Sequence, residues 1–201
     1  MLILATGLML GGLGGCDKDD NGGGSGGNKV TGILGTKFAD WEMVGVSFSG
    51  DVYGENPDWE TTADVVNGKF TLTLPVPANK YLEDIDDEAP EGATITPSDA
   101  KWAYARFYLK KASQIGRIVL YYEGTTSYVV VSYMYVDKDM SITGTYSEED
   151  DGDVFIFTYN AKLKKGWNAF IATYIEAKNG DYLCTVTANG NIPSGARWEA
   201  W

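Results

Sequence analysis

The sequence predicts an all-β fold, an antiparallel β-sandwich or two small β subdomains packed together, behind a disordered N-terminal tether. From Val30 onward, apolar residues recur with a period of two, which is the spacing of strands whose two faces differ. Short β-prone segments follow one another at hairpin spacing, separated by glycine-containing turns. No long amphipathic helix pattern appears, which excludes TIM-barrel and Rossmann architectures.

Composition limits the classes of partner and chemistry. The chain has 201 residues, 28 acidic and 16 basic side chains and a formal net charge of -12. It lacks the excess of Lys and Arg with which proteins neutralise phosphates, so we expect no nucleic-acid partner. It also has no histidine, which excludes histidine-based triads, general bases and zinc ligands.

Residues 1–15 are predicted to be a signal peptide. The apolar run that ends at Leu13 is shorter than the roughly 20 residues a membrane-spanning helix needs, but it suits the core of an export signal. Leu13-Gly14-Gly15-Cys16 resembles the lipobox of bacterial lipoproteins, which implies a covalent lipid (palmitate among its acyl chains) on Cys16 and a membrane anchor. A free N-terminal cysteine and a short buried core segment are the alternatives. No Lys or Arg precedes the run, so we expect the true translation start to lie upstream.

Residues 16–28 form a lipidated tether in this interpretation. The stretch after Cys16 is acidic and then glycine-rich, with nothing apolar to bury. A cysteine followed by acidic residues resembles the surface-export signal of Bacteroidetes lipoproteins, which implies an outer-membrane location facing the cell exterior. The same residues could open an EF-hand loop, but Asn28 stands where that loop needs a bidentate Glu.

The remaining chain divides into a first β segment at 29–78, a connector with a helical turn or loop at 79–100, and a second β segment at 101–201. In the first segment Phe70, Leu72 and Leu74 alternate on one face of a strand that Pro75 ends. This segment weakly resembles prealbumin-like domains. Strands of the second segment are expected at 101–110, 115–123, 127–136, 140–146, 154–164, 167–177 and 182–188.

Two features of the second segment carry further expectations. The stretch 128–135 is apolar on both faces and is predicted to be a central strand that is covered on both sides. The element Lys165-Gly166-Trp167-Asn168 between two strands resembles one that recurs in small Bacteroidetes lipoproteins. That resemblance implies a location and an all-β fold, and it brings no catalytic residue.

Carboxylates cluster at 83–91 and 148–153. Solvated loops that keep the protein soluble and prevent edge-to-edge pairing account for both runs. A weak Ca²⁺ site at Glu149, Asp151 and Asp153 is the alternative for the second run, because several hard oxygens on one turn suit that ion. A glycosidase would instead need two carboxyl groups converging across a sugar.

Aromatic residues suggest a ligand surface. One face of the predicted strand 101–110 carries Trp102, Tyr104, Arg106 and Tyr108, and the other carries small and aliphatic residues. The first face could stack on a glycan or contact a surface protein, while packing inside a two-layer domain also accounts for such rings. With Cys16 acylated, Cys184 has no disulfide partner and is expected to be a buried, inert thiol.

Taken together, the sequence predicts an outer-membrane, surface-exposed lipoprotein that serves as a non-enzymatic binding or structural module for a glycan or a protein. Apart from the lipid on Cys16 and the weak Ca²⁺ site, no cofactor is expected. Two alternatives remain: a carboxylate-dependent enzyme acting on glycans, and a pilus-like assembly subunit, which would present an unpaired strand edge.

Overall fold

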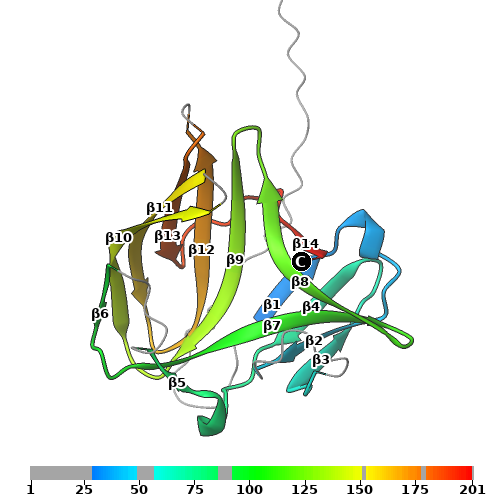
Figure 1. The fold of residues 1–201 in the computed structure, drawn as a ribbon. Helices are drawn as coiled ribbons and strands as arrows, with labels where there is room; N and C mark the ends of the chain where they lie inside the picture. The colour runs from blue at the N-terminus through cyan, green and yellow to red at the C-terminus, as the bar shows by residue number, and fades with distance from the viewer. Residues whose placement is uncertain (1–28, 49–56, 86–91, 151–152, 178–179, 201) are drawn as a thin grey trace, which may run out of the picture.

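The computed structural model describes residues 29–48, 57–85, 92–150, 153–177 and 180–200. The predicted signal peptide and tether, including Cys16, lie outside these described residues. The described chain is all-β, with sheets packed on one another as the sequence predicts (Figure 1). Its helices are two 3-10 turns, η1 (Thr36–Phe38) and η2 (Asn79–Tyr81), and no described helix could span a membrane.

A large, almost entirely antiparallel sheet and a small two-stranded sheet make up the fold. The small sheet pairs β1 (Lys29–Ile33) with β4 (Lys69–Thr73). In the large sheet only β11 and β13 run parallel among the described strands. Its strands in spatial order are β3 (Thr61–Asp64), β2 (Met43–Ser47), β7 (Lys101–Lys111), β8 (Gln114–Glu123), β9 (Ser127–Val136), β12 (Gly166–Glu176), β13 (Tyr182–Ala188), β11 (Asp153–Leu163), β10 (Met140–Asp150) and β6 (Ala93–Thr96), with β5 (Glu83–Asp84) on β7 and β14 (Arg197–Ala200) on β8.

The long strand β7 joins two halves of the large sheet. Its first part, from Trp102 to Ala105, pairs with β9, and its second part, from Phe107 to Lys111, pairs with β8. Beyond β9, the strands β12, β13, β11, β10 and β6 curl together at the left of Figure 1, and we call β9 with these five strands the curled half. Because β2 from the first β segment also pairs with β7, the two predicted segments share one sheet.

The first core lies between the small sheet and the large one. The predicted alternation in β4 is present, because Phe70 and Leu72 are buried and face the large sheet. At its centre lies the Trp198 side chain, which is 1% exposed and packs against Phe70, Phe107 and Tyr133. The C-terminal strand β14 therefore closes this core.

A second core fills one end of the curled half. The connector contributes Ile85 and Ala100 to it, and the rest comes from strands of the second segment. Its buried members are Ile85, Ala100, Trp102, Met134, Val136, Met140, Ile142, Ala161 and Leu163.

Strand β9 shows that the two faces of the large sheet differ. Val129 and Val131 point into the first core, and we call their side the packed face. Met134 lies on the other side, the open face, within the second core. At the opposite end of β9, Tyr128 on the open face is only half-buried. The predicted covering of this strand on both sides therefore holds at its C-terminal end alone.

The Lys-Gly-Trp-Asn element forms a tightly bonded turn between β11 and β12. Gly166 has a φ of 104°, a conformation that favours glycine. The buried Asn168 amide donates to the carbonyls of Lys164 at 2.7 Å and Gly166 at 2.9 Å, and its Oδ1 accepts from the Asn189 side chain at 2.8 Å. Trp167 Nε1 donates to the Pro75 carbonyl at 3.0 Å, which ties the turn to the first segment. The element thus has a structural role here.

Candidate functional site

The four predicted ligand-contact residues on β7 lie on the open face, but two of their rings are covered. Trp102 is 5% exposed within the second core, with its ring centroid 4.9 Å from that of half-buried Tyr104. Tyr108 is 4% exposed beneath Trp59, which meets it edge to face at 6.1 Å. Arg106 is half-buried and donates to the Phe48 carbonyl. The expected alternation is present, and burial leaves little of Trp102 and Tyr108 for a ligand.

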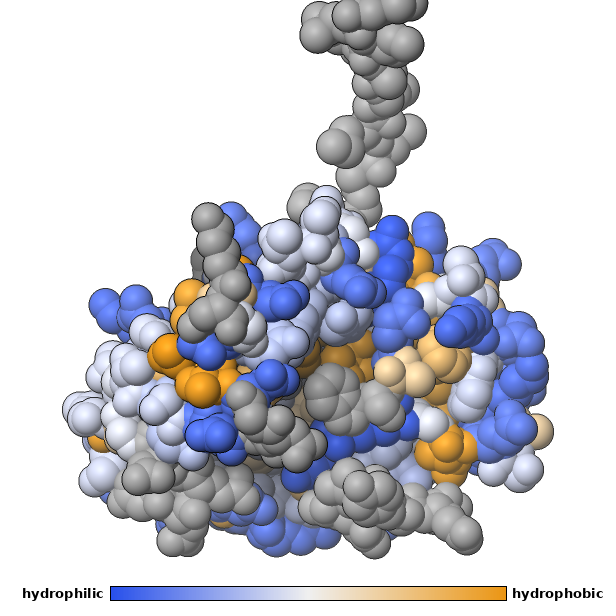
Figure 2. Space-filling view, turned by 45° about the horizontal axis from the view of Figure 1, so that its top comes forward, coloured by the Kyte–Doolittle hydropathy of each residue, from blue (hydrophilic) through white to orange (hydrophobic). Residues whose placement is uncertain are grey.

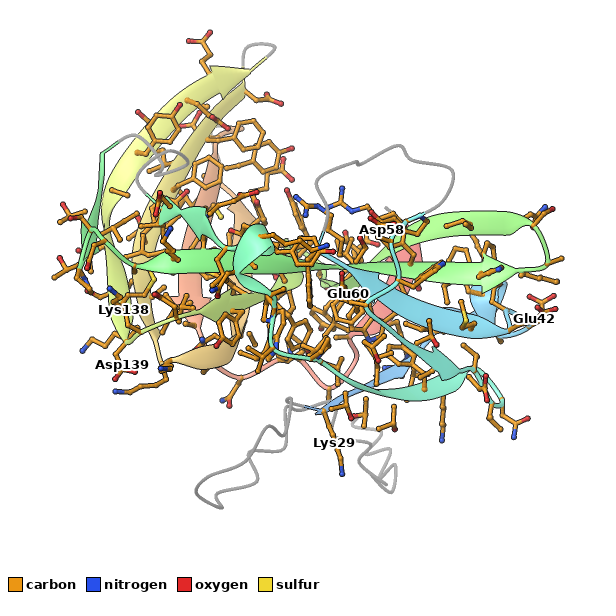
Figure 3. All side chains as sticks on the ribbon, turned by 90° about the horizontal axis from the view of Figure 1, so that it is seen from below. Lys29, Glu42, Asp58, Glu60, Lys138 and Asp139 are labelled. Atoms are coloured by element: carbon orange, nitrogen blue, oxygen red, sulfur yellow. The ribbon has the colours of Figure 1, made fainter. Side chains whose placement is uncertain are left out.

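Residues 58 and 60, which flank Trp59, are labelled in Figure 3. Asp58 and Glu60 lie near the middle of the molecule, whereas Lys138 and Asp139 mark one end and Glu42 the other. Both carboxylates are exposed.

Trp59 also covers Gly45 on β2, where an added Cβ would lie 2.0 Å from the Trp59 ring. Because Gly45 has no side chain, Trp59 can lie over Tyr108.

The predicted Ca²⁺ ligands are not gathered by the described strands. Glu149 is directly opposite Val154, whereas Asp153 is directly opposite Asp150. Paired residues share a face and successive residues alternate, so Glu149 and Asp153 point to opposite faces of the hairpin. Asp151 lies outside the described residues. Within the described part of the chain, no group of three or more Asp, Glu or Cys side chains is placed to hold a metal ion.

A row of aromatic side chains crosses the curled half on its open face. Tyr128 on β9 is directly opposite Tyr174 on β12, which is opposite Cys184 on β13. Cys184 is opposite Phe157 on β11, and Phe157 is opposite Tyr146 on β10. The four rings are half-buried and line up across strands far apart in sequence. Ring side chains crowd beside the yellow strands of this half in Figure 3.

Ring contacts fix the orientation of this row. Tyr128 and Tyr174 stack with centroids 4.4 Å apart and planes 9° apart, and Phe157 meets Tyr174 edge to face at 6.3 Å. Two residues before Phe157 on β11, Phe155 stacks on Tyr182 with ring centroids 4.9 Å apart and ring planes 11° apart. Such offset and perpendicular pairs are the arrangements that aromatic quadrupoles favour. We call Tyr128, Tyr146, Phe155, Phe157, Tyr174 and Tyr182 the aromatic row.

Small side chains border the aromatic row on the side of the second core. Val130, Ala172, Val186, Tyr159 and Gly144 are opposite one another on β9, β12, β13, β11 and β10. Apart from Tyr159, these residues are too short to cover the neighbouring rings. On that side the Tyr159 ring stacks on Phe157 with centroids 6.4 Å apart, and the other bordering side chains are short.

Carboxylates lie at the ends of the row. Tyr182 is opposite Glu176 on one side and Phe155 on the other, and Phe155 is opposite Glu148. Glu123 is opposite Tyr128. All three carboxylates are exposed. Ring surface with acceptor oxygens at its ends offers both apolar contact and hydrogen bonding.

Burial keeps the polar atoms within the row in their neutral forms. Desolvation raises the pKa of Tyr174 and Tyr128 above the ordinary range, so their hydroxyls are neutral donors at neutral pH. Burial raises the pKa of the Cys184 thiol to about 11, and a hydrogen bond with Tyr174 opposes that shift in part. Cys184 is 1% exposed, which confirms the predicted burial of this cysteine, and its inertness stays a prediction.

Two hollows adjoin the row where the open face passes onto β8. A cavity of about 80 Å³ is lined by Arg106, Arg117, Val119, Val130 and Ser132, among others. A larger one of about 610 Å³ is lined by residues of the paired strands β8 and β14, among them Tyr121, Glu123, Arg197 and Glu199. Val119 contributes to the lining of both cavities. Figure 2 shows patches of apolar surface over both halves of the molecule, set among hydrophilic side chains.

The outer edge of β10 also bears on function. Strand β6 pairs with β10 only from Ser141 to Gly144. Beyond Gly144 the described residues supply no partner strand on that side, and this stretch carries Glu148 and Glu149. Charged side chains on an edge oppose pairing with another strand.

Sequence reasoning missed the aromatic row because its members come from five strands. Each strand shows its rings at alternate positions, as Phe155 and Phe157 do, but the sequence does not reveal which strands lie side by side. A search against protein-family models, curated proteins and solved structures found no match for this chain. The resemblances to Bacteroidetes lipoproteins and to prealbumin-like domains stay predictions.

Proposed function

We propose that this chain is an outer-membrane lipoprotein, anchored through Cys16 and facing the cell exterior, whose β domain is a non-enzymatic module that binds a glycan on the aromatic row. The lipobox-like Leu13-Gly14-Gly15-Cys16 and the acidic, glycine-rich stretch after it support the anchor and the location.

The observation that carries the binding role is the placement of half-buried, mutually stacked rings on a face that the described chain leaves open. In a core, such rings are covered, as Trp198 is. Here Tyr128, Tyr174 and Phe157 are held in fixed orientations by one another while part of each stays accessible. Pre-oriented rings give a ligand a large contact area at little entropic cost. The tyrosine hydroxyls and the flanking carboxylates suit the hydroxyl groups of a sugar.

The carboxylates favour binding over catalysis. A glycosidase needs one carboxyl group whose pKa is raised by burial. Among the described carboxylates, those with clearly shifted values have a lowered pKa. The Lys138 ammonium lowers the pKa of Asp99, and Lys164 lowers that of Asp139, both at exposed ion pairs. These are the properties of surface charges.

The test is glycan binding by the full chain carrying Cys16→Ala, which prevents acylation, first on a glycan array and then by calorimetry. Tyr174→Ala removes a ring from the middle of the aromatic row and should weaken binding about tenfold, the effect of losing roughly 1.4 kcal/mol of contact energy. Ile175→Ala is the matched control, because Ile175 is the next residue on β12, is 44% exposed and points to the packed side. Equal affinity for Tyr174→Ala and the parent chain, or no glycan bound at all, would overturn the proposal.

A further inference from the structure

Resting on the proposed glycan-binding role, we propose that the ligand is an anionic glycan, and that Arg106 and Arg117 hold one of its carboxylate or sulfate groups in the small cavity beside the aromatic row.

All three arginines of the chain lie on the open face. Arg197 on β14 is directly opposite Tyr121 on β8, and Arg117 lies four residues earlier on β8, so these side chains share a face. Arg117 is directly opposite Tyr108 on β7, and Arg106 lies two residues before Tyr108. The three arginines therefore belong to the same surface as the aromatic row, on three neighbouring strands.

The cavity of about 80 Å³ suits an anionic group. Arg106 and Arg117 line it together with Ser132, and its other lining residues are apolar. No carboxylate lines it. Arg117 is half-buried, with no ion pair or hydrogen bond to any described residue. A guanidinium group binds carboxylates and sulfate-like groups through paired hydrogen bonds, which are stronger when partly shielded from water.

The larger cavity offers a different environment. There Arg197 shares the lining with Glu123 and Glu199, so donors and acceptors occur together. Its Nη1 already donates to the Ala196 carbonyl at 2.7 Å. Hydroxyl groups, which donate and accept, suit such a mixed lining. Along β8, Arg117 lies roughly 14 Å from the position opposite Arg197, at about 3.4 Å per residue. A chain lying across both cavities would thus place its acidic unit at Arg117 and a neutral unit near Arg197.

A glycan fits this face better than an acidic peptide does. Extended peptides gain affinity mainly from main-chain hydrogen bonds at an exposed strand edge. The aromatic row and the arginine cavity lie on the face of the sheet, where main-chain groups are already paired between strands such as β9 and β12. The net charge of -12 repels any polyanion at long range, but over distances beyond about 10 Å salt screens that repulsion. Contact with the arginines then decides which ligand is held.

The experiment compares matched ligands and variants by calorimetry on the full chain carrying Cys16→Ala. The ligands are polygalacturonate with its carboxyl-reduced form, dextran sulfate with dextran, and poly-glutamate. We expect a charged member to bind at least tenfold more tightly than its neutral counterpart, with affinity falling as salt rises. The carboxylate and sulfate pairs show which group is recognised. Arg117→Gln should remove the preference, and Arg117→Lys should restore part of it. Lys162→Gln, which removes an exposed charge from the other face of β11, should leave the preference unchanged.

The outcomes separate the two proposals. If charged and neutral glycans bind equally and Arg117→Gln changes nothing, the anionic ligand is wrong and the glycan-binding role stands. If no glycan binds, both fail. If poly-glutamate binds as tightly as the glycans and depends on Arg117, the occupant is an acidic peptide and this inference is overturned. The urea midpoint of each variant, expected to match that of the parent chain, shows that a lost preference does not come from unfolding.

Discussion

The Trp198 indole occupies the space that a side chain at Gly32 would take. A Cβ added to Gly32 would lie 2.3 Å from Trp198 Nε1 and 2.5 Å from the Phe70 ring. Strand β1 therefore has a glycine, Gly32, at the point where β14 inserts the Trp198 side chain. A backbone hydrogen bond ties the two segments together nearby, because the Gly35 N–H donates to the Trp198 carbonyl at 2.9 Å.

Gly32→Ala should destabilise the fold. The added methyl group would force the buried indole and ring to move, and overpacking of this kind costs about 1–3 kcal/mol. Urea unfolding followed by tryptophan fluorescence measures the change. Gly116→Ala serves as the control, because a Cβ there would meet its nearest neighbour, on Trp41, at an ordinary 3.6 Å. Equal midpoints for the two variants would contradict the close packing of Gly32 on Trp198.

Asn168→Ala should cost about 2–4 kcal/mol of stability. The substitution leaves the backbone groups of Lys164 and Gly166 and the Asn189 amide without their partner at a nearly dry site. Chemical denaturation measures the loss. Asn160→Ala removes an amide of the same kind from an exposed position on β11 and should change stability by less than about 0.5 kcal/mol. A mild effect at Asn168 would show that the turn does not depend on these bonds.

Cys184 should resist alkylation in the folded protein and react once the chain unfolds. Its pKa of about 11 leaves almost no thiolate at pH 8, and its sulfur is buried. The raised pKa also makes stability depend on pH. Between about pH 9, the ordinary pKa of a thiol, and about pH 11, the unfolded chain releases the proton while the folded one retains it.

The free energy of unfolding should therefore be unaffected by this group below about pH 9 and should fall as the pH rises toward 11. Denaturation midpoints of the parent chain and of Cys184→Ala, measured from pH 7 to 11, isolate this part of the pH dependence. Rapid iodoacetamide labelling of the folded chain at pH 8 would show that the thiol is not sealed beneath Tyr174.

Cys16→Ala should release the protein from the membrane. The acyl chains on a lipoprotein cysteine contribute about 0.8 kcal/mol for each buried CH₂, enough for durable attachment when two or more chains are present. Fractionation of a bacterium expressing the parent and variant chains, with mass spectrometry of the amino terminus, measures the effect. Recovery of both chains from the same soluble fraction, with an unmodified Cys16, would refute the anchor and the outward-facing location.

Periodicity predicts the strands well and their arrangement poorly. The strands at 127–136 and 182–188 agree with β9 and β13 at both ends, because their apolar residues alternate up to clear turn residues. The predicted strand at 140–146 is longer in the structure, since Glu148 and Glu149 continue β10 as edge residues. Acidic side chains are compatible with a strand when one side of it faces solvent. The stretch at 93–96, which reads as polar, becomes β6 because it pairs with β10.

The candidate site depends on pairing that no single segment encodes. The alternation of the two faces of β7 was predictable from the sequence. The covering of Tyr108 by Trp59 was not. Likewise, Tyr128, Phe157 and Tyr174 each follow a strand pattern in the sequence, and only the order of β9, β12, β13 and β11 brings them into one row. Long-range register is set by core packing across the whole sheet, which local spacing does not specify.

For a lipoprotein anchored at Cys16 as we propose, the pairing of β9 with both β7 and β8 has a mechanical consequence. The domain begins at Lys29 in the small sheet, whereas the aromatic row lies in the curled half. A pull on a captured ligand would load the curled half first and would pass to the rest of the domain through the ladders that β9 forms with β7 and with β8. Both ladders, at 102–105 on β7 and at 120–123 on β8, must break before the halves can part. In the location that we propose, drag on the ligand would then be shared by the backbone hydrogen bonds of both ladders.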